Sequence, residues 1–147
     1  PTHKFVIPNP FGPYEDPRFC AYLLKTWSHG EVARIGTPNY IRDNIHISLL
    51  AECYAEFIAK TIMQPGNHYC APSGYIEMQG AFTQRFAREI GSRLNLETKF
   101  EFAVQTDFPE PEMRVNTDRP KLTNFACNEV LAWDELAEYY RTVYLVK

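Results

Sequence analysis

Apolar side chains recur at helical spacing along the first half of the sequence and predict two helices. Asp16 can cap the first helix, Pro17 suits its first helical position, and Gly30 can end it. Ser48 can cap the second helix, and Pro65 stops it. The apolar faces of these helices consist of Phe19, Leu23 and Trp27, and of Leu49, Leu50, Cys53, Phe57, Ile58 and Ile62.

The second half of the sequence predicts two more helices by the same criterion. The third helix is weakened near its start by Gly80, because glycine costs conformational entropy there. The last helix is expected to begin at about Asp134. Their inward-facing residues are Phe82, Phe86, Ile90 and Leu94, and then Leu136, Tyr140 and Val143.

Short apolar runs between the helices predict strands. These runs cover residues 4–7, 32–35, 41–47, 67–71 and 100–104. The first run leads directly into a proline-rich segment, which we interpret as a rigid loop, and the stretch around Pro109 to Pro120 is irregular and acidic. The elements are therefore mixed α and β and fit an α/β layer arrangement, although strong strands are too few for a complete doubly wound sheet.

Composition indicates a folded chain and excludes two classes of partner. The 147 residues are 45% hydrophobic and 22% charged, so we expect one domain, residues 1–147, with its own core. The net charge of −3 and the scattered basic residues exclude a nucleic-acid-binding stripe. No apolar run approaches the roughly 20 residues that cross a bilayer, so we expect no membrane partner and a cytoplasmic location.

The cysteines and acidic pairs do not suggest a metal or catalytic centre. The four cysteines include no C-x-x-C pair and are interpreted as reduced thiols, of which Cys20 and Cys53 fall on apolar helix faces. The four histidines lack metal-ligand spacing, so no metal site is expected. Glu52 and Glu56 lie one helical turn apart, which is more typical of a solvated face than of an acid/base pair.

Two loop residues are better candidates for ligand contacts. Asn9 lies at a strand end in the proline-rich segment, where its amide can face a ligand or simply hydrogen-bond the turn. Arg42 lies between a Gly-Pro turn and the start of the second helix, where its guanidinium can bind phosphate. The alternative for Arg42 is an ion pair with Asp43 or another acid.

These residues belong to an ordered series of motifs. The series is Asn9-Pro10-Phe11-Gly12-Pro13, then Gly30 and Ile35-Gly36, and then Arg42-Asp43-Asn44-Ile45-His46-Ile47. In order and spacing it resembles the second half of extended short-chain dehydrogenase/reductases, the NAD-dependent epimerase/dehydratase family of sugar nucleotides. A weaker likeness continues through the second helix to Asn116-Thr117-Asp118 with Lys121, which looks like the family's late Asp-x-x-Lys element.

The resemblance implies a role for each matching position. Asn9 and Arg42 match residues that bind the substrate diphosphate, Arg18 and Phe19 match a loop that contacts phosphate and base, and Ile35 matches the strand beside the base. A diphosphate is bound well by a planar guanidinium and amide donors, and a base by an apolar slot. The implied fold is a small mixed α/β substrate-binding domain with short strands and three to four helices, without the N-terminal Rossmann half.

The sequence departs from the family pattern at three places. Asn44 stands where the family has an aromatic residue, and Ser48 begins a pair that is usually acidic. The second phosphate-binding arginine, expected several residues before Asp118, has no clear counterpart, because Arg114 is too close. We therefore expect a substrate geometry that differs from that of common epimerases.

The family's cofactor and catalytic motifs lie before the position of Asn9. The sequence holds no glycine-rich G-x-G-x-x-G loop, and none of its nine tyrosines is followed by lysine at the fourth position. We therefore expect the parent enzyme to use NAD or NADP, this chain to bind none, and no residue here to be catalytic. A free-standing, non-catalytic binding or scaffolding module derived from the family is the alternative. A small hydrolase using cysteine or histidine is disfavoured, since no nucleophile and base can be paired.

The first predicted strand also indicates that this chain self-associates. In the family it joins a sheet supplied by the missing half, so this chain would carry an unpaired strand edge and an uncovered apolar face. We expect a homo-oligomer, formed by exchange or addition of elements.

Overall fold

The computed structural model describes residues 1–120 and 125–145, with side chains of the second range given from residue 129. Lys121 of the predicted Asp-x-x-Lys element and the side chain of Cys127 lie outside this description. The helices are α1 (Phe19–Ser28), α2 (Ile47–Met63), α3 (Gln79–Leu94) and α4 (Phe125–Tyr140), followed by the π-helical turn η1 (Arg141–Leu145). The strands are β1 (His3–Phe5), β2 (Asn9–Phe11), β3 (Ala33–Ile35), β4 (Ile41–His46), β5 (His68–Cys70), β6 (Tyr75–Met78), β7 (Phe100–Phe102) and β8 (Met113–Arg114).

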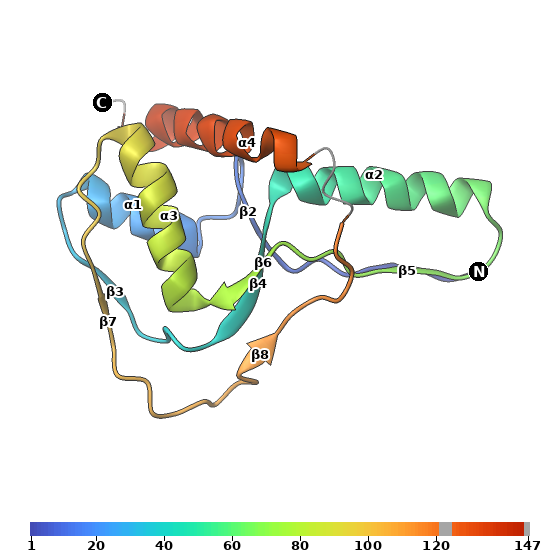
Figure 1. The fold of residues 1–147 in the computed structure, drawn as a ribbon, viewed down its shortest axis with the longest axis horizontal. Coiled ribbons are helices and arrows are strands. Elements are labelled where there is room, and N and C mark those ends of the chain that lie inside the picture. Colours follow the sequence, from blue (N-terminus) through green and yellow to red (C-terminus); the bar gives the residue numbers. More distant parts are fainter. Residues whose placement is uncertain (121–124, 146–147) are drawn as a thin grey trace.

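The described strands form three small sheets. The central sheet has the order β2-β4-β6, with β8 also paired to β4, and β6 is its antiparallel member. The other two are parallel pairs, β1 with β5 and β3 with β7. In Figure 1, α2 and the β1–β5 pair extend to one side, away from the body that contains α1 and α3. The predicted mixed α/β fold with short strands is confirmed.

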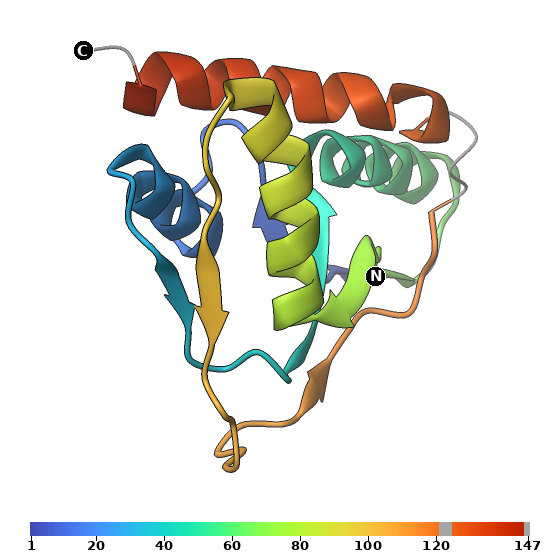
Figure 2. The same ribbon diagram turned by 60° about the vertical axis from the view of Figure 1, so that its left-hand side comes forward.

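Two hydrophobic clusters hold these elements together. The larger cluster joins α1, α3 and α4, and its largest fully buried side chains include Trp27, Phe86 and Tyr140. The smaller cluster lies under α2 and contains Ile45 with helix residues Leu49, Leu50 and Cys53 and with Ala132 of α4. Because α4 contributes to both clusters, it joins the two parts of the molecule, and Figure 2 shows it lying across the ends of α3 and α2.

The predicted helix starts need correction. Asp16 does not cap α1, because residues 12–15 form a tight turn in which the Glu15 N–H donates to the Gly12 carbonyl, and the helix begins at Phe19. Ser48 does not cap α2, because the His46 ring accepts the Ser48 N–H at 3.2 Å and so caps the helix itself.

The end of the chain also differs from the prediction. Helix α4 begins at Phe125 rather than near Asp134, since Ala132 and Trp133 already pack inward. Val143 is half exposed in the π-helical turn instead of facing inward. Leu136 and Tyr140 are fully buried, as predicted.

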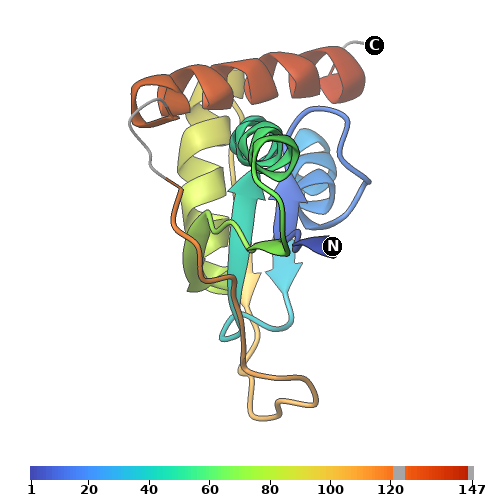
Figure 3. The same cartoon turned by 90° about the vertical axis from the view of Figure 1, so that its right-hand side faces the viewer.

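The strand predictions were incomplete. The segment interpreted as a rigid loop contains β2, whose three residues pair with the end of β4. Strand β6, and the short β8 within the irregular acidic stretch, were not predicted. The predicted strand at 100–104 ends at Phe102, and Val104 is 91% exposed on the connection between β7 and β8, which loops out at the end opposite α4 (Figure 3).

Other sequence predictions are confirmed by the structure. Phe82, Phe86, Ile90 and Leu94 are all buried along α3. Cys20 and Cys53 are buried free thiols, and Glu52 and Glu56 lie on the exposed face of α2. No helix in the described ranges is long and apolar enough to cross a bilayer.

The turn before β6 yields a stability prediction. A Cβ atom on Gly74 would lie 2.3 Å from the Asn44 carbonyl oxygen and 2.8 Å from Ile45 Cα, so Gly74→Ala forces β4 and the turn apart. We expect a loss of about 2–3 kcal/mol in the free energy of unfolding, measured by urea denaturation. Gly36→Ala is the matched control, since nothing lies within 4 Å of its added Cβ, and an equal loss in both variants would contradict the explanation.

Candidate functional site

Four of the five predicted site residues lie around one hollow. It has a volume of about 210 Å³ and lies between β2, β4 and the first turns of α1 and α3. We call it the central hollow, and its lining consists of Asn9, Pro10, Phe11, Glu15, Arg18, Phe19, Cys20, Arg42, Asn44, Gln79 and Phe82. Segments separated by up to 73 residues in the sequence, from Asn9 to Phe82, thus meet at one place.

The fifth predicted residue, Ile35, lies elsewhere. It is 2% exposed in β3, belongs to the main hydrophobic cluster and does not line the central hollow. Alternation along β3 explains this placement, because Ala33 and Ile35 point inward while Arg34 points to solvent.

Strand pairing positions the amides of the central hollow. Asn9 of β2 and Asn44 of β4 are direct partners in the parallel register. Side chains at paired positions lie on the same face, so two amides stand side by side near the guanidinium-bearing residue Arg42. Asn44 is one of the departures from the family pattern, and its amide lines the central hollow.

Asp43 is not the partner of Arg42. Its side chain is 1% exposed and accepts the N–H of Gly74 at 2.7 Å and the N–H of Asn116 at 3.0 Å. The Asn116 side chain in turn donates to the carbonyls of Val6 and Pro72, both at 2.9 Å. Asp43 and Asn116 therefore tie four segments together beside the site, a role that sequence spacing did not reveal.

Arg42 instead lies against the acidic stretch after β7. Its Nη1 donates to the carbonyls of Ile41 at 2.9 Å and Glu112 at 3.1 Å, and its Nη2 lies 3.4 Å from the Glu110 carboxylate. The guanidinium stacks over the Tyr40 ring, with Cζ 4.2 Å from the ring centroid. Only 12% of the Arg42 side chain is exposed, and its guanidinium is held by the Tyr40 ring on one face and by hydrogen bonds from its N–H groups.

A second hollow lies next to the first and shares Asn9 and Arg42 with it. We call it the lower hollow; it has a volume of about 420 Å³. Its lining consists of Ile7, Pro8, Asn9, Arg42, Asp43, Arg114, Val115 and Asn116. Arg114, which the sequence did not assign to the site, is the register partner of Arg42 on β8. Sequence reasoning set Arg114 aside because it lies too close to Asp118 for the family spacing, and the short strand β8 that pairs it with Arg42 was not predicted.

Glu15 is a half-buried carboxylate that lines the central hollow. It accepts hydrogen bonds from the hydroxyl of Tyr140 and, at 3.4 Å, from the Gly12 N–H. Burial raises the pKa of Glu15, although both hydrogen bonds oppose that shift. Burial likewise raises the pKa of the neighbouring Cys20 thiol, so this cysteine is a poor nucleophile. Glu15 therefore fixes the loop before α1 to the end of α4.

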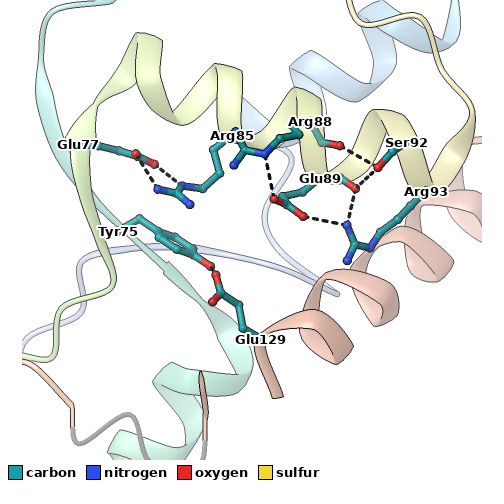
Figure 4. A network of polar contacts seen from close by, with 8 residues as sticks. All are labelled: Tyr75, Glu77, Arg85, Arg88, Glu89, Ser92, Arg93 and Glu129. Atoms are coloured by element: carbon teal, nitrogen blue, oxygen red, sulfur yellow. Dashed lines mark hydrogen bonds and ion pairs between the residues drawn. The ribbon is translucent and has the colours of Figure 1, made fainter. Parts of the chain in front are cut away.

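Another polar network supports the floor of the site. Figure 4 shows Tyr75 of β6 pointing to Glu129 at the start of α4, to which it donates a hydrogen bond. Arg85 of α3 makes a two-point ion pair with Glu77, at 2.8 and 3.1 Å, and its Cζ lies 4.5 Å from the Tyr75 ring centroid. Burial and Glu129 raise the pKa of Tyr75. This network joins β6, α3 and α4 and is not a catalytic tyrosine-lysine pair.

No metal centre is formed by the residues that the structure describes, since no three histidine, cysteine, aspartate or glutamate side chains come together as ligands. The side chains at the two hollows therefore offer hydrogen-bond donors and charged groups. Each hollow is lined by two arginines and two asparagines, which are Arg18, Arg42, Asn9 and Asn44 at the central hollow and Arg42, Arg114, Asn9 and Asn116 at the lower hollow.

Comparison with known proteins supports the fold assignment. No protein-family model matches the sequence, and no curated protein is similar to it at a significant level. Solved structures do match: UDP-N-acetylglucosamine 4-epimerase of Methanobrevibacter ruminantium, in complex with UDP-N-acetylmuramic acid, has a TM-score of 0.66 at 13% identity, over 95% of this chain and 46% of that one.

Two bacterial epimerases give similar values. UDP-glucose 4-epimerase of Thermotoga maritima, with UDP-glucose, has a TM-score of 0.60 at 15% identity and covers 95% and 46% of the two chains. The Thermus thermophilus enzyme, with NAD, has a TM-score of 0.60 at 12% identity and covers 96% and 47%. The predicted resemblance is thus confirmed at the level of the fold, and the chain spans about half the length of these enzymes, as expected for a C-terminal part.

His46, at the end of β4, yields a pH prediction. Burial lowers its pKa from 6.5 to about 4, while a hydrogen bond with the Ala132 backbone opposes the shift. The folded state disfavours the protonated ring, so the free energy of unfolding is at its full value above about pH 6.5 and falls, by on the order of 3 kcal/mol in total, as the pH drops toward 4.

The measurement is urea denaturation of wild type and His46→Asn at several pH values between 4 and 7.5. Asparagine can still accept the Ser48 N–H but does not titrate, so its stability should decline less toward acid. His29→Asn, at an exposed position, is the control and should follow the wild type. Parallel pH profiles for wild type and His46→Asn would contradict the assignment.

Proposed function

We propose that this chain is the substrate-side part of an NAD(P)-dependent enzyme that acts on a nucleotide sugar, and that it binds the diphosphate and base of that substrate. The supporting observation is that Asn9, Arg18, Phe19 and Arg42 line one hollow although they come from three separate segments. The matched solved structures include epimerases with UDP-sugars and with NAD, which supports the same substrate class for the parent.

Each residue contributes a different interaction to ligand binding. Arg42 supplies a fixed positive charge whose Nη2 group can donate to phosphate, and Asn9 supplies a neutral donor beside it. Arg18 is 76% exposed at the mouth of the central hollow, and Phe19 behind it offers an apolar surface for a base. Ile35 lies too deep to touch a ligand directly, so in this proposal it supports the base-binding wall from the core.

The dinucleotide cofactor does not fit the described residues of this chain. A pyrophosphate needs free backbone N–H groups at a glycine-rich helix start after a parallel strand. The helix in that position, α2, has no glycine in its first turn, and the His46 ring already accepts the Ser48 N–H. We therefore assign NAD or NADP, and the proton-transferring tyrosine, to a Rossmann half of the parent, and we propose that this chain alone is inactive.

Binding of UDP-glucose, measured by calorimetry, tests the phosphate role. Arg42→Ala should weaken binding by roughly tenfold or more, since a charge-assisted contact to phosphate is lost. Arg42→Lys keeps the charge but not the fork and should be intermediate, which separates ligand contact from loss of folding. Arg34→Ala, which removes an exposed arginine outside both hollows, should bind like the wild type, and an Arg42→Ala variant that binds normally would overturn the proposal.

We also propose that the isolated chain self-associates through α2. This helix exposes an apolar stripe of Tyr54, Ile58, Ile62 and Met63, of which the last two are 76% and 79% exposed. The neighbouring strand β1 pairs only with β5 within the described residues and so leaves one edge open. The same surface would contact the Rossmann half in the parent.

Light scattering as a function of concentration tests this association. The wild type should form dimers or larger species, and Ile62→Glu should shift it to monomer, because a charge is placed in the stripe. Val104→Glu is the matched control, since Val104 is at least as exposed but lies far from α2 on the β7–β8 connection. A wild type that stays monomeric at high concentration would refute the proposal.

A further inference from the structure

Two arginines are held next to each other at the lower hollow. Arg42 of β4 and Arg114 of β8 are direct partners in a parallel register, so their side chains leave the same face of adjacent strands. Like charges at paired positions repel each other, and an anion between them relieves that repulsion. The arrangement therefore defines an anion position at this place on the sheet.

In the structure the anion is part of the chain itself. Oxygen Oε2 of Glu110 lies 3.4 Å from Nη2 of Arg42 and 3.4 Å from Nη1 of Arg114. One carboxylate oxygen thus serves both guanidinium groups. Glu110 comes from the connection between β7 and β8, which loops out from the body (Figure 3).

Both contacts of the Glu110 carboxylate are long and partly exposed to water. Both distances exceed those of a good charge-assisted hydrogen bond, and 54% of the Glu110 side chain is exposed, so water screens the charges. This segment also has a 3.2 Å hydrogen bond from the Glu110 N–H to the Tyr40 hydroxyl, an edge-on contact of Phe108 with the Tyr40 ring, and a 3.3 Å hydrogen bond from the Gln105 side chain to the Asp107 carbonyl. The Pro111 carbonyl, next in the chain, accepts from Arg42 Nη1 at 3.3 Å.

The Arg42 guanidinium, by contrast, does not depend on Glu110. Its Nη1 is held by the carbonyls of Ile41 and Glu112, and its face is held by Tyr40. If Glu110 swings away, the guanidinium stays where it is with Nη2 available. A phosphate group has more oxygens and more charge than one carboxylate and can contact both arginines at shorter distances.

We propose that Glu110 is an internal competitor that occupies the anion position in the free protein, and that a phosphate group of the ligand displaces it and releases residues 107–110. This inference rests on the proposed function, since it takes the displacing group to be the substrate diphosphate. The contacts of Glu110 with the two arginines must then break before the ligand binds, which lowers the affinity. The connection between β7 and β8 thus acts as an autoinhibitory strap, a segment that lies across the site in the free protein.

Binding of UDP-glucose and of inorganic pyrophosphate to Glu110→Gln is the first test. The variant should bind both probes about three- to tenfold more tightly than the wild type, because the competitor is removed. Glu112→Gln is the matched control: it removes the same charge two residues away, from an exposed carboxylate that makes no ion pair within the described residues, and its affinity should stay within about twofold of the wild type.

Hydrogen exchange of backbone amides gives a second test. Removing a negative charge can raise the affinity for an anion from a distance, but it does not by itself speed amide exchange in this segment. Pyrophosphate should speed exchange of the amides of Asp107, Phe108 and Glu110 in the wild type, and most of all the Glu110 amide, which donates to Tyr40 in the free protein. In Glu110→Gln these amides should already exchange faster without ligand. Slower exchange on binding would mean that the segment closes over the ligand and would overturn the proposal.

The outcomes separate the two proposals. One outcome is that the wild type binds UDP-glucose in an Arg42-dependent manner while Glu110→Gln and Glu112→Gln have equal affinity. The proposal that Glu110 competes with the ligand is then refuted, and the proposed function stands. If neither the wild type nor Glu110→Gln binds either probe, the phosphate role of Arg42 fails and the strap fails with it. Tighter binding by Glu110→Gln alone, with faster exchange at 107–110, supports both.

Discussion

The site depends on a buried carboxylate that binds no ligand. Asp43 is almost fully enclosed, and it is stable there because both of its oxygens accept backbone N–H groups, from Gly74 and Asn116. A charge without those donors would be strongly unfavourable at such a depth. The requirement to satisfy Asp43 therefore brings the turn before β6 and the segment after β8 to the middle strand, and Val115 and Asn116 of the latter segment line the lower hollow.

This constraint explains why consecutive residues of β4 have such different roles. Alternation along the strand sends Asp43 and Ile45 inward, and leaves Arg42 and Asn44 facing the hollows. The inward residues hold the central sheet and the α2 cluster, while the outward residues provide polar groups that are fixed in place. Rigid support of this kind suits recognition of a charged, flexible ligand, because the protein side chains lose little conformational freedom when the ligand binds.

Sequence reasoning predicted the local elements better than their pairing. The packed faces of α1 and α3 follow from periodicity, and most strands follow from short apolar runs. On α2 only the part of the predicted apolar face up to Phe57 is buried, whereas Ile58 and Ile62 are exposed. The starts of α1 and α2 were wrong because a tight turn at Gly12–Glu15 and the ring of His46 act where Asp16 and Ser48 were expected to. The convergence of Asn9, Arg18, Phe19 and Arg42 was expected only through the family resemblance. Arg114 was set aside on spacing and Glu110 was not considered, because their positions depend on the long-range pairing of β8 with β4, which no local pattern encodes.

The segment from His3 to Phe11 runs through two different sheets. Its first part pairs with β5 and its last part with β4, and Pro8, which cannot donate a backbone hydrogen bond, lies at the changeover. The open edge at Phe5 and the amide of Asn9 are thus joined by a few covalent bonds of one extended backbone. Any strand that adds to that edge and any ligand that touches Asn9 act on the same short segment. Thermodynamic reciprocity then requires that if assembly changes ligand affinity, ligand changes assembly by an equal factor.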